Sequence, residues 1–281
     1  MIKAIDKTTV FYDLEYVPDV ATIRRVYNIG QDVDDKGALA VAYLNHKASA
    51  ENPTPMLKTM FYRIVSMAAI VRKVSGVQAD GSHAVSLSLF SLPAIVDGVP
   101  SAAEADIIAR ILNFVGKNKA QMVGFANSAF DQTLLVQRAV INGISCPEFF
   151  ARPDKPWEGK DYFAKFSDAV VDMCDVLSGG YGHAKPKLGD FCAAMGIPGK
   201  LGVDGGMVAD MVAQGRLSEV IPYNEHDTAS TYLLWLNFVH TAGLLSYARY
   251  RAECAQFREY LEGLANNASG QHWHDFLEAW T

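Results

Sequence analysis

The sequence has few cysteines and no excess of positive charge. Only four of its 281 residues are cysteines, and none belongs to a C-x-x-C pair. This excludes a small disulfide-stapled scaffold and predicts reduced thiols in a cytoplasmic protein. The 25 Lys and Arg residues are outnumbered by 31 Asp and Glu residues, which gives a net charge of −6. Such a chain does not hold nucleic acid through a broad basic surface, so any contact with a polyanion must be made at a local site.

The hydrophobic pattern predicts no membrane span and no secretion signal. Residues 228–247 carry no Asp, Glu, Lys or Arg, but Asn237, His240 and Gly243 interrupt them. A spanning helix needs about 20 predominantly apolar residues, so this stretch predicts a buried helix that then turns. The start of the chain lacks the apolar segment of a signal peptide. We therefore expect a cytoplasmic protein that makes no membrane contact.

What the chain does have is enough apolar residues, half of the total, to bury a full core. Period-2 and period-3.6 patterns predict five strands, at residues 8–17, 61–73, 83–92, 121–126 and 169–176. They predict helices at residues 102–115, 129–142, 225–238 and along the tail from 246. We expect a turn at Asp80 and Gly81, a capping box formed by Ser101 and Glu104, and one helix within the polar residues 20–58. This order predicts an α/β protein with a mixed five-stranded sheet flanked by helices.

Asp13 and Glu15 are the first candidate site residues. They lie two apart on an apolar strand, so their side chains leave the same face. Neighbouring carboxylates repel each other unless a positive charge lies between them. A divalent cation with oxygen ligands satisfies that requirement. An ordinary surface pair explains the pattern equally well when these two residues are taken alone.

Two further acids lie at helix starts. Asp131 follows a short strand and opens a helix, where the helix dipole alone favours a carboxylate. Tyr223 and Asp227 are four residues apart and therefore share one face of a helix. Because that helix continues as an apolar segment, the Asp227 carboxylate needs a partner. His226 points away from that face, and we expect it to be exposed or to pack.

Together these pieces resemble the three motifs of the proofreading, DnaQ-like 3′–5′ exonucleases. The motifs are D-x-E at residues 13–15, N-x-x-F-D at 127–131 and Y-x-x-x-D at 223–227. The intervening landmarks resemble the stand-alone exonucleases related to the proofreading domain of family-B DNA polymerases; they are residues 171–178, 187–190, 196–200, 204–205 and 215–217. The resemblance implies a ribonuclease-H-like fold in a single exonuclease domain, residues 1–281. The motifs would occupy a core at residues 8–240, followed by a helical C-terminal extension at 241–281.

The resemblance also implies a two-metal site. Asp13, Glu15, Asp131 and Asp227 would hold two Mg²⁺ or Mn²⁺ ions, and Tyr223 would orient the attacking water. Pro222 occupies the position where related enzymes carry a histidine, so the chain resembles the tyrosine (DEDDy) subclass. Two such metals activate water and neutralise charge during phosphodiester hydrolysis. The ions also explain how an acidic protein can bind a polyanion.

Five further residues are candidates for substrate binding. Tyr16 stands where relatives usually have threonine, and it could stack on a terminal base. Asn127 could touch the terminal nucleotide. The lysines lie on loops and could contact phosphates, although solvated surface lysines are the simpler interpretation; they are Lys185, Lys187 and Lys200. We expect Asp172 and Asp175 to have structural roles.

The expected activity is metal-dependent 3′–5′ removal of nucleotides from single-stranded DNA ends. The same chemistry on RNA or short oligonucleotides is the nearest alternative, because nothing in the sequence reads the ribose 2′ position. A non-catalytic nucleic-acid-binding adaptor on the same fold is the alternative of another class. The presence of all four acids and the tyrosine favours an enzyme, since an adaptor has no chemical need for them.

Overall fold

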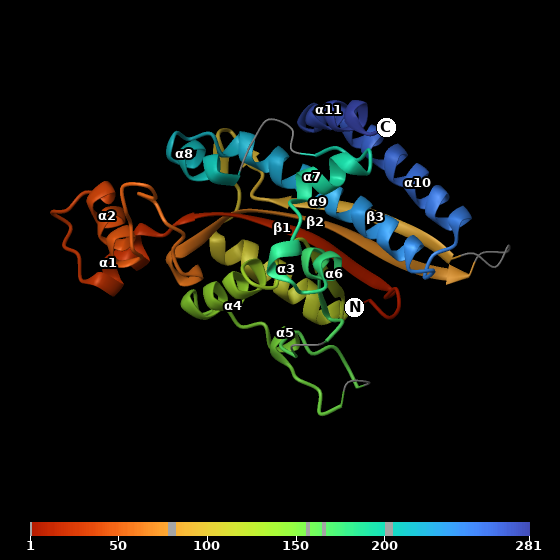
Figure 1. Ribbon diagram of the computed structural model, residues 1–281, viewed down its shortest axis with the longest axis horizontal. Helices are drawn as coiled ribbons and strands as arrows, with labels where there is room; N and C mark the ends of the chain where they lie inside the picture. Colours follow the sequence, from red (N-terminus) through yellow and green to blue (C-terminus); the bar gives the residue numbers. More distant parts are fainter. Residues whose placement is uncertain (1, 78–82, 156–157, 165–166, 200–204) are drawn as a thin grey trace.

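A five-stranded mixed sheet forms the centre of the computed structural model, which describes residues 2–77, 83–155, 158–164, 167–199 and 205–281. Its order is β3-β2-β1-β6-β7 (Figure 1). The strands are β1 (Thr8–Pro18), β2 (Tyr62–Val77), β3 (His83–Leu92), β6 (Gln121–Gly124) and β7 (Val170–Asp172). β1, β2 and β3 pair antiparallel, whereas β1, β6 and β7 pair parallel. A separate pair is formed by β4 (Ile95–Val96) and β5 (Val99–Pro100). The expected mixed five-stranded sheet is confirmed, while the turn expected at Asp80 and Gly81 lies outside the described residues.

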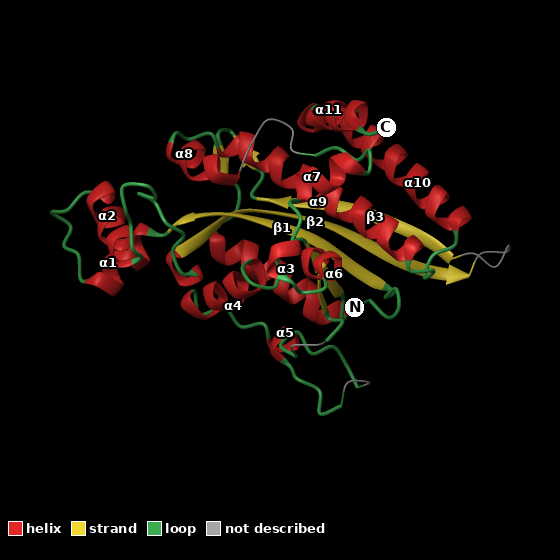
Figure 2. Cartoon of the chain, in the orientation of Figure 1, coloured by secondary structure: helices red, strands yellow, loops and turns green. Residues whose placement is uncertain are grey.

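Helices cover both faces of this sheet (Figure 2). One face carries α3 (Glu104–Asn118), α4 (Asp131–Ile141) and α5 (Pro147–Phe150). The other carries α7 (Leu188–Ala194), α9 (Leu217–Thr241), α10 (Tyr247–Ala265) and α11 (His272–Ala279). The shorter helices are α1 (Val20–Tyr27), α2 (Asp35–Asn45), α6 (Met173–Ser178) and α8 (Val208–Ala213).

Alternate residues of β1 enter two separate hydrophobic cores. Val10, Tyr12 and Leu14 pack in the core of the α3–α4 face, whereas Phe11 packs under α9 against Tyr232 and Trp235. Because the side chains of a strand alternate, Asp13 and Glu15 continue the row of Phe11 toward the α9 face.

The polar residues 20–58 hold two helices, so the expectation of one helix was wrong. α1 begins at an N-cap in which the Asp19 carboxylate accepts from the backbone N–H of Thr22. α2 begins in the same way, with Asp34 accepting from the N–H of Gly37. Each cap satisfies a helix-start donor that the polar sequence would otherwise leave to water. Both helices lie beyond the C-terminal end of β1 (Figure 1).

The strand expected at 169–176 ends at Asp172, where α6 begins. The Asp172 carboxylate accepts from the N–H groups of Cys174 and Asp175, at 2.9 and 3.3 Å. An N-cap of this kind turns the chain from strand into helix. The second half of the expected strand is therefore helical.

The capping box expected at Ser101 and Glu104 was also wrong. α3 has Ala103 as its N-cap, whose N–H donates to Asp106. The Ser101 hydroxyl instead accepts from the N–H of Ala94. The Glu104 carboxylate is drawn away from the helix end because it binds the Arg138 guanidinium through two hydrogen bonds, of 2.5 and 2.8 Å.

Arg138 ties three elements together below the sheet. Besides Glu104 of α3, it binds the Asp19 carboxylate at the start of α1 at 2.7 Å. Arg138 itself belongs to α4 and is buried. A buried arginine that lost one of these partners would destabilise the fold by several kcal/mol, so the pairs hold α4 in a defined position. Because α4 begins at Asp131, the same pairs also position that residue.

The apolar stretch at 228–247 forms most of α9, which is buried along the sheet. Its residues Leu233, Leu234 and Trp235 are at most 2% exposed. The helix ends at Thr241, and the chain turns at Gly243, which has a φ of 74°. Among the described residues, none of the helices combines the length and the apolar character that crossing a membrane requires.

Candidate active site

Asp13 and Glu15 lie where β1 extends beyond the end of its parallel partner, β6. The pairing of β1 with β6 ends at Phe11 and Val123, whereas the pairing with β2 continues through Glu15. The register of β1 and β2 shifts between Glu15 and Tyr16. The two acids therefore occupy the carboxyl-end edge of the sheet, which is where open α/β sheets bind ligands.

α9 brings Tyr223 and Asp227 onto the same face. The Thr228 hydroxyl lies 3.5 Å from the carbonyl oxygen of Ala68, and Ala68 is the cross-strand partner of Asp13. The first turns of α9 therefore lie over the acidic part of β1. Tyr223 is 7% exposed and is hydrogen-bonded to Asp227 through its side chain. The expected sharing of one helix face by these two residues is confirmed.

Asp131 reaches the site from the loop that follows β6. The Asp172 carboxylate holds this loop by accepting from the N–H groups of Ala126 and Ser128, at 2.9 and 3.0 Å. Ala126 has a positive φ of 57°, a strained conformation that the two neighbouring hydrogen bonds support. Asp172 thus supports the backbone ahead of Asp131, in agreement with the structural role expected for it.

Electrostatics shows that the four expected carboxylates share one region. The pKa of Asp13 is raised well above its usual value, first by burial and then by the charges of Glu15, Asp227 and Asp131. Burial raises the pKa of Asp131 to about 8, and the charge of Asp172 contributes. Carboxylates that oppose one another's ionisation in this way are stabilised by a cation placed between them.

The donor set fits a hard divalent cation. Asp and Glu oxygens are the ligands that Mg²⁺ and Mn²⁺ prefer, and they come here from three separate elements. Within the described part of the chain, no group of three or more His, Cys, Asp or Glu side chains already has an arrangement that would hold a metal ion. The charges of the four acids thus act on one region, but their side chains do not already surround a common centre in the described part of the chain.

Tyr223 is held in its protonated form. Burial, followed by the charge of Asp227, raises its pKa above the ordinary value for a phenol. Its hydroxyl lies beside Gly205, where an added Cβ would come within 3.8 Å of the oxygen. The phenol is thus a fixed hydrogen-bond donor and acceptor next to the acids.

Tyr16 belongs to an aromatic cluster that borders the acids. Its ring stacks on Phe130 with the centroids 4.3 Å apart and meets Tyr62 edge-on at 5.1 Å. Burial raises the pKa of Tyr16, and the charges of Asp131 and Glu15 raise it further. The cluster joins the end of β1 to the residue that precedes Asp131.

Asn127 faces the interior. It is 1% exposed, and its amide donates to the Tyr12 hydroxyl at 3.0 Å. Its side chain also fills the space that a Cβ on Gly124 would occupy, within 2.8 Å. The direct nucleotide contact expected of Asn127 does not fit this placement, because packing draws the amide into the core of the loop.

Two of the three candidate lysines lie within the described residues. Lys185 forms a half-exposed ion pair with Asp175 at 2.7 Å. Lys187 is exposed just before α7. Lys200 lies outside the described residues. A phosphate contact by any of the three stays a prediction.

A polar cluster behind Asp227 was missed by sequence reasoning. The Glu225 carboxylate accepts from the Ser91 hydroxyl of β3 and is 2.6 Å from Nε2 of His272. A carboxylate only accepts, so this ring nitrogen of His272 carries the hydrogen. Residues 225 and 272 are 47 positions apart, and no local pattern links them.

His226 packs, as expected. Its ring lies against Trp273 and Phe276 of α11, and its Nε2 is 3.1 Å from the carbonyl oxygen of His272. Burial lowers the pKa of His226 to about 4, so the ring is neutral at pH 7. Together with Glu225, it fastens α11 to the turn of α9 that carries Asp227.

The comparison with known families agrees with these observations. Residues 54–280 match the family described as predicted 3′–5′ exonucleases related to the exonuclease domain of PolB. The matched range contains Asp131, Tyr223 and Asp227 and begins after Asp13 and Glu15. It also includes α10 and α11, so it extends past residue 240, where we expected the family core to end.

A search of curated proteins finds no matching relative. The family match over most of the chain and the observed sheet order confirm the expected ribonuclease-H-like fold. The chain belongs to the family of predicted 3′–5′ exonucleases related to the exonuclease domain of PolB.

Proposed function

We propose that this protein is a metal-dependent 3′–5′ exonuclease that removes nucleotides from single-stranded DNA ends. One observation carries the proposal: carboxylates from β1, α4 and α9 lie close enough to raise the pKa of Asp13. Buried acids that repel one another lower the stability of a fold, so their convergence at one sheet edge calls for a functional reason. The chain belongs to a family of predicted exonucleases, which supports a catalytic reason for this convergence.

Asp13, Glu15, Asp131 and Asp227 would hold two Mg²⁺ or Mn²⁺ ions. When bound, such ions lower the pKa of water and neutralise charge on the phosphate. The carboxylates would set the positions of these ions, with Asp13 next to all three of the other acids. The protonated Tyr223 would orient the attacking water through its hydroxyl, which is the role we expected for it.

The aromatic cluster favours a frayed or single-stranded end as the substrate. Tyr16 and Phe130 present stacked rings beside the acids, and a nucleotide base could extend that stack. A paired end would first have to unstack, which costs a few kcal/mol. RNA remains the second candidate substrate, because the two-metal chemistry proposed here would act on either strand and nothing in the sequence reads the ribose 2′ position.

The test is a digestion assay on single strands labelled at the 3′ or the 5′ end, run on DNA and RNA with Mn²⁺, Mg²⁺ or EDTA. We expect stepwise shortening from the 3′ end, only with metal, and slower cutting of a blunt duplex. A circular single strand is the matched control, because it has no end. Efficient cutting of the circle would overturn the exonuclease proposal. Metal-independent cutting would overturn the two-metal site, and strand binding without any cutting would favour the adaptor alternative.

A further inference from the structure

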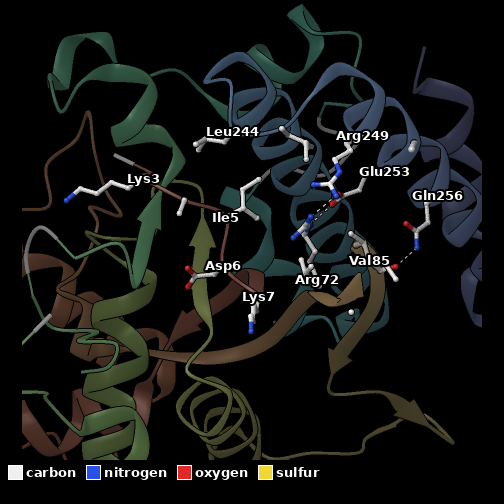
Figure 3. A pocket seen from close by; sticks show the side chains of 16 residues that line it. Lys3, Ile5, Asp6, Lys7, Arg72, Val85, Leu244, Arg249, Glu253 and Gln256 are labelled. Carbon is white, nitrogen blue, oxygen red and sulfur yellow. Dashed lines mark hydrogen bonds and ion pairs between the residues drawn. The ribbon is translucent and has the colours of Figure 1, made fainter. Parts of the chain in front are cut away.

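A hollow lies at the opposite end of the sheet from the acids. It has a volume of about 950 Å³ and is lined by the N-terminal segment 3–7, by β2 and β3, and by α10 with the turn before it (Figure 3). Lys7 on its rim precedes Asp13 by six residues. At about 3.3 Å per residue of strand, the two sites are roughly 20 Å apart.

A buried ion pair forms one wall of this hollow. Arg72 binds Glu253 through two hydrogen bonds, of 2.5 Å from Nε and 2.9 Å from Nη2. Their side chains are only 3% and 5% exposed. The Tyr232 hydroxyl also donates to Glu253, at 2.8 Å. The guanidinium is therefore fixed in place: it lies 5.4 Å from the centroid of the Trp235 ring, and its remaining nitrogen, Nη1, is buried without a hydrogen-bond partner in the described structure.

The charges around the hollow favour an anion. Four cationic side chains and two carboxylates line it. Both carboxylates are already paired, Glu253 with Arg72 and Asp6 with Lys160 at 2.6 Å. The other cations, Lys3, Lys7 and Arg249, are exposed and form no ion pair with another described residue. The hollow is thus locally positive in a chain whose net charge is −6.

Apolar side chains complete the lining. Ile5, Val74, Val85, Leu244 and Leu245 contribute surface to the same hollow. A mostly apolar concavity with a few fixed polar groups is typical of small-molecule sites, and the volume lies within their usual range. Free inorganic phosphate would leave these walls uncovered.

We propose that this hollow binds a small organic anion, with its phosphate or carboxylate group near Arg249 and its apolar body against the aliphatic walls. Arg249 is exposed at the hollow and forms no ion pair with another described residue, so its guanidinium would bind the anionic group, while the buried Arg72–Glu253 pair forms the wall behind it. The exposed lysines would add attraction at the rim. The proposal does not depend on nuclease activity.

The test is titration calorimetry of the full chain in EDTA, with adenosine 5′-monophosphate, benzoate and inorganic phosphate as probes. We expect saturable binding of the nucleotide or of the aromatic carboxylate, with inorganic phosphate at least fivefold weaker. Whichever organic probe binds identifies the anionic group. Arg249→Glu should weaken that binding at least fivefold. Arg251→Glu, an exposed arginine on the same helix that does not line this hollow, should change it less than twofold.

Three results would overturn the proposal. The first concerns the probes: neither organic probe binds saturably at millimolar concentration, or inorganic phosphate binds as tightly as the organic anions. Another is an effect of Arg249→Glu smaller than fivefold or matched by Arg251→Glu. The third is loss of binding in Asp13→Asn, which would place the ligand at the acidic edge. None of these results bears on whether DNA is cut, so the two proposals fail separately.

Discussion

His272 of α11 holds Glu225 of α9 through a contact of 2.6 Å between its Nε2 and a carboxylate oxygen. Glu225 lies between Tyr223 and Asp227 along the same helix. The C-terminal helices therefore contact the helix segment that carries two of the expected catalytic residues. Removing the His272 side chain should alter the position of Asp227 without removing any proposed metal ligand.

We expect His272→Ala to lower exonuclease activity about tenfold, because Glu225 would lose a partner in a mostly buried position. His272→Gln, which can still donate a hydrogen bond, should restore part of the rate. The measurements are kcat and KM on a labelled single strand, with thermal unfolding of each variant. His274→Ala is the control, since His274 is exposed on the same helix. Equal losses in the Ala and Gln variants would argue against a hydrogen-bonded positioning role.

Asp13→Asn should abolish nearly all hydrolysis while leaving the fold intact. The pKa of Asp13 responds to the charges of all three other acids, so it is placed to influence both proposed ions. Loss of a metal-site charge is expected to lower kcat by about 10³-fold or more. Single-turnover digestion measures the rate, and circular dichroism checks the fold. Activity within tenfold of the unmodified protein would contradict the two-metal assignment.

Tyr223→Phe should separate water orientation from metal binding. The substitution removes only the hydroxyl that is bonded to Asp227, so we expect a rate loss of about 10–10³-fold. Mn²⁺ affinity, measured by calorimetry, should stay within a few-fold of that of the unmodified protein. If the affinity fell as far as in Asp13→Asn, Tyr223 would be a structural support for the acids.

Without metal, the protein should lose stability as the pH rises. Burial raises the pKa of Asp131 from its ordinary value of 3.8 to about 8 in the folded state, so between these values the folded chain holds a proton that the unfolded chain releases. Stability therefore falls as pH rises through this window. We expect the Tm in EDTA to drop by several degrees from pH 5 to pH 8.

Two comparisons test this cause of the pH dependence. Asp131→Asn should make the decrease in Tm smaller, because one of the two acids with a raised pKa is gone. Added Mn²⁺ should raise the Tm more at pH 8 than at pH 5, since a cation stabilises the ionised acids. A Tm in EDTA that rises between pH 5 and pH 8 would contradict the pKa direction of Asp131.

Features that depend on near neighbours in the chain were predicted well. The alternation along β1 correctly placed Asp13 and Glu15 on one face, and the four-residue spacing correctly placed Tyr223 with Asp227. These arrangements follow from the repeat of a strand or a helix, which residues two or four apart already define. The strand boundary that was predicted wrongly also has a local cause: Asp172 caps α6, so β7 ends there and not at residue 176.

Features that depend on distant contacts were decided by tertiary structure. The identities of Asn127 and Glu104 favoured a substrate contact and a helix cap, yet packing against Tyr12 and Arg138 drew both side chains elsewhere. A polar side chain takes whichever partner offsets its burial best, and a partner far along the chain leaves no periodic signal. By itself, the sequence determined which residues could carry the chemistry and which faces they occupy. Only the packing of α9 over β1 brought those acids together, and only the packing of α11 on α9 paired His272 with Glu225, because hydrophobic burial sets how elements cross.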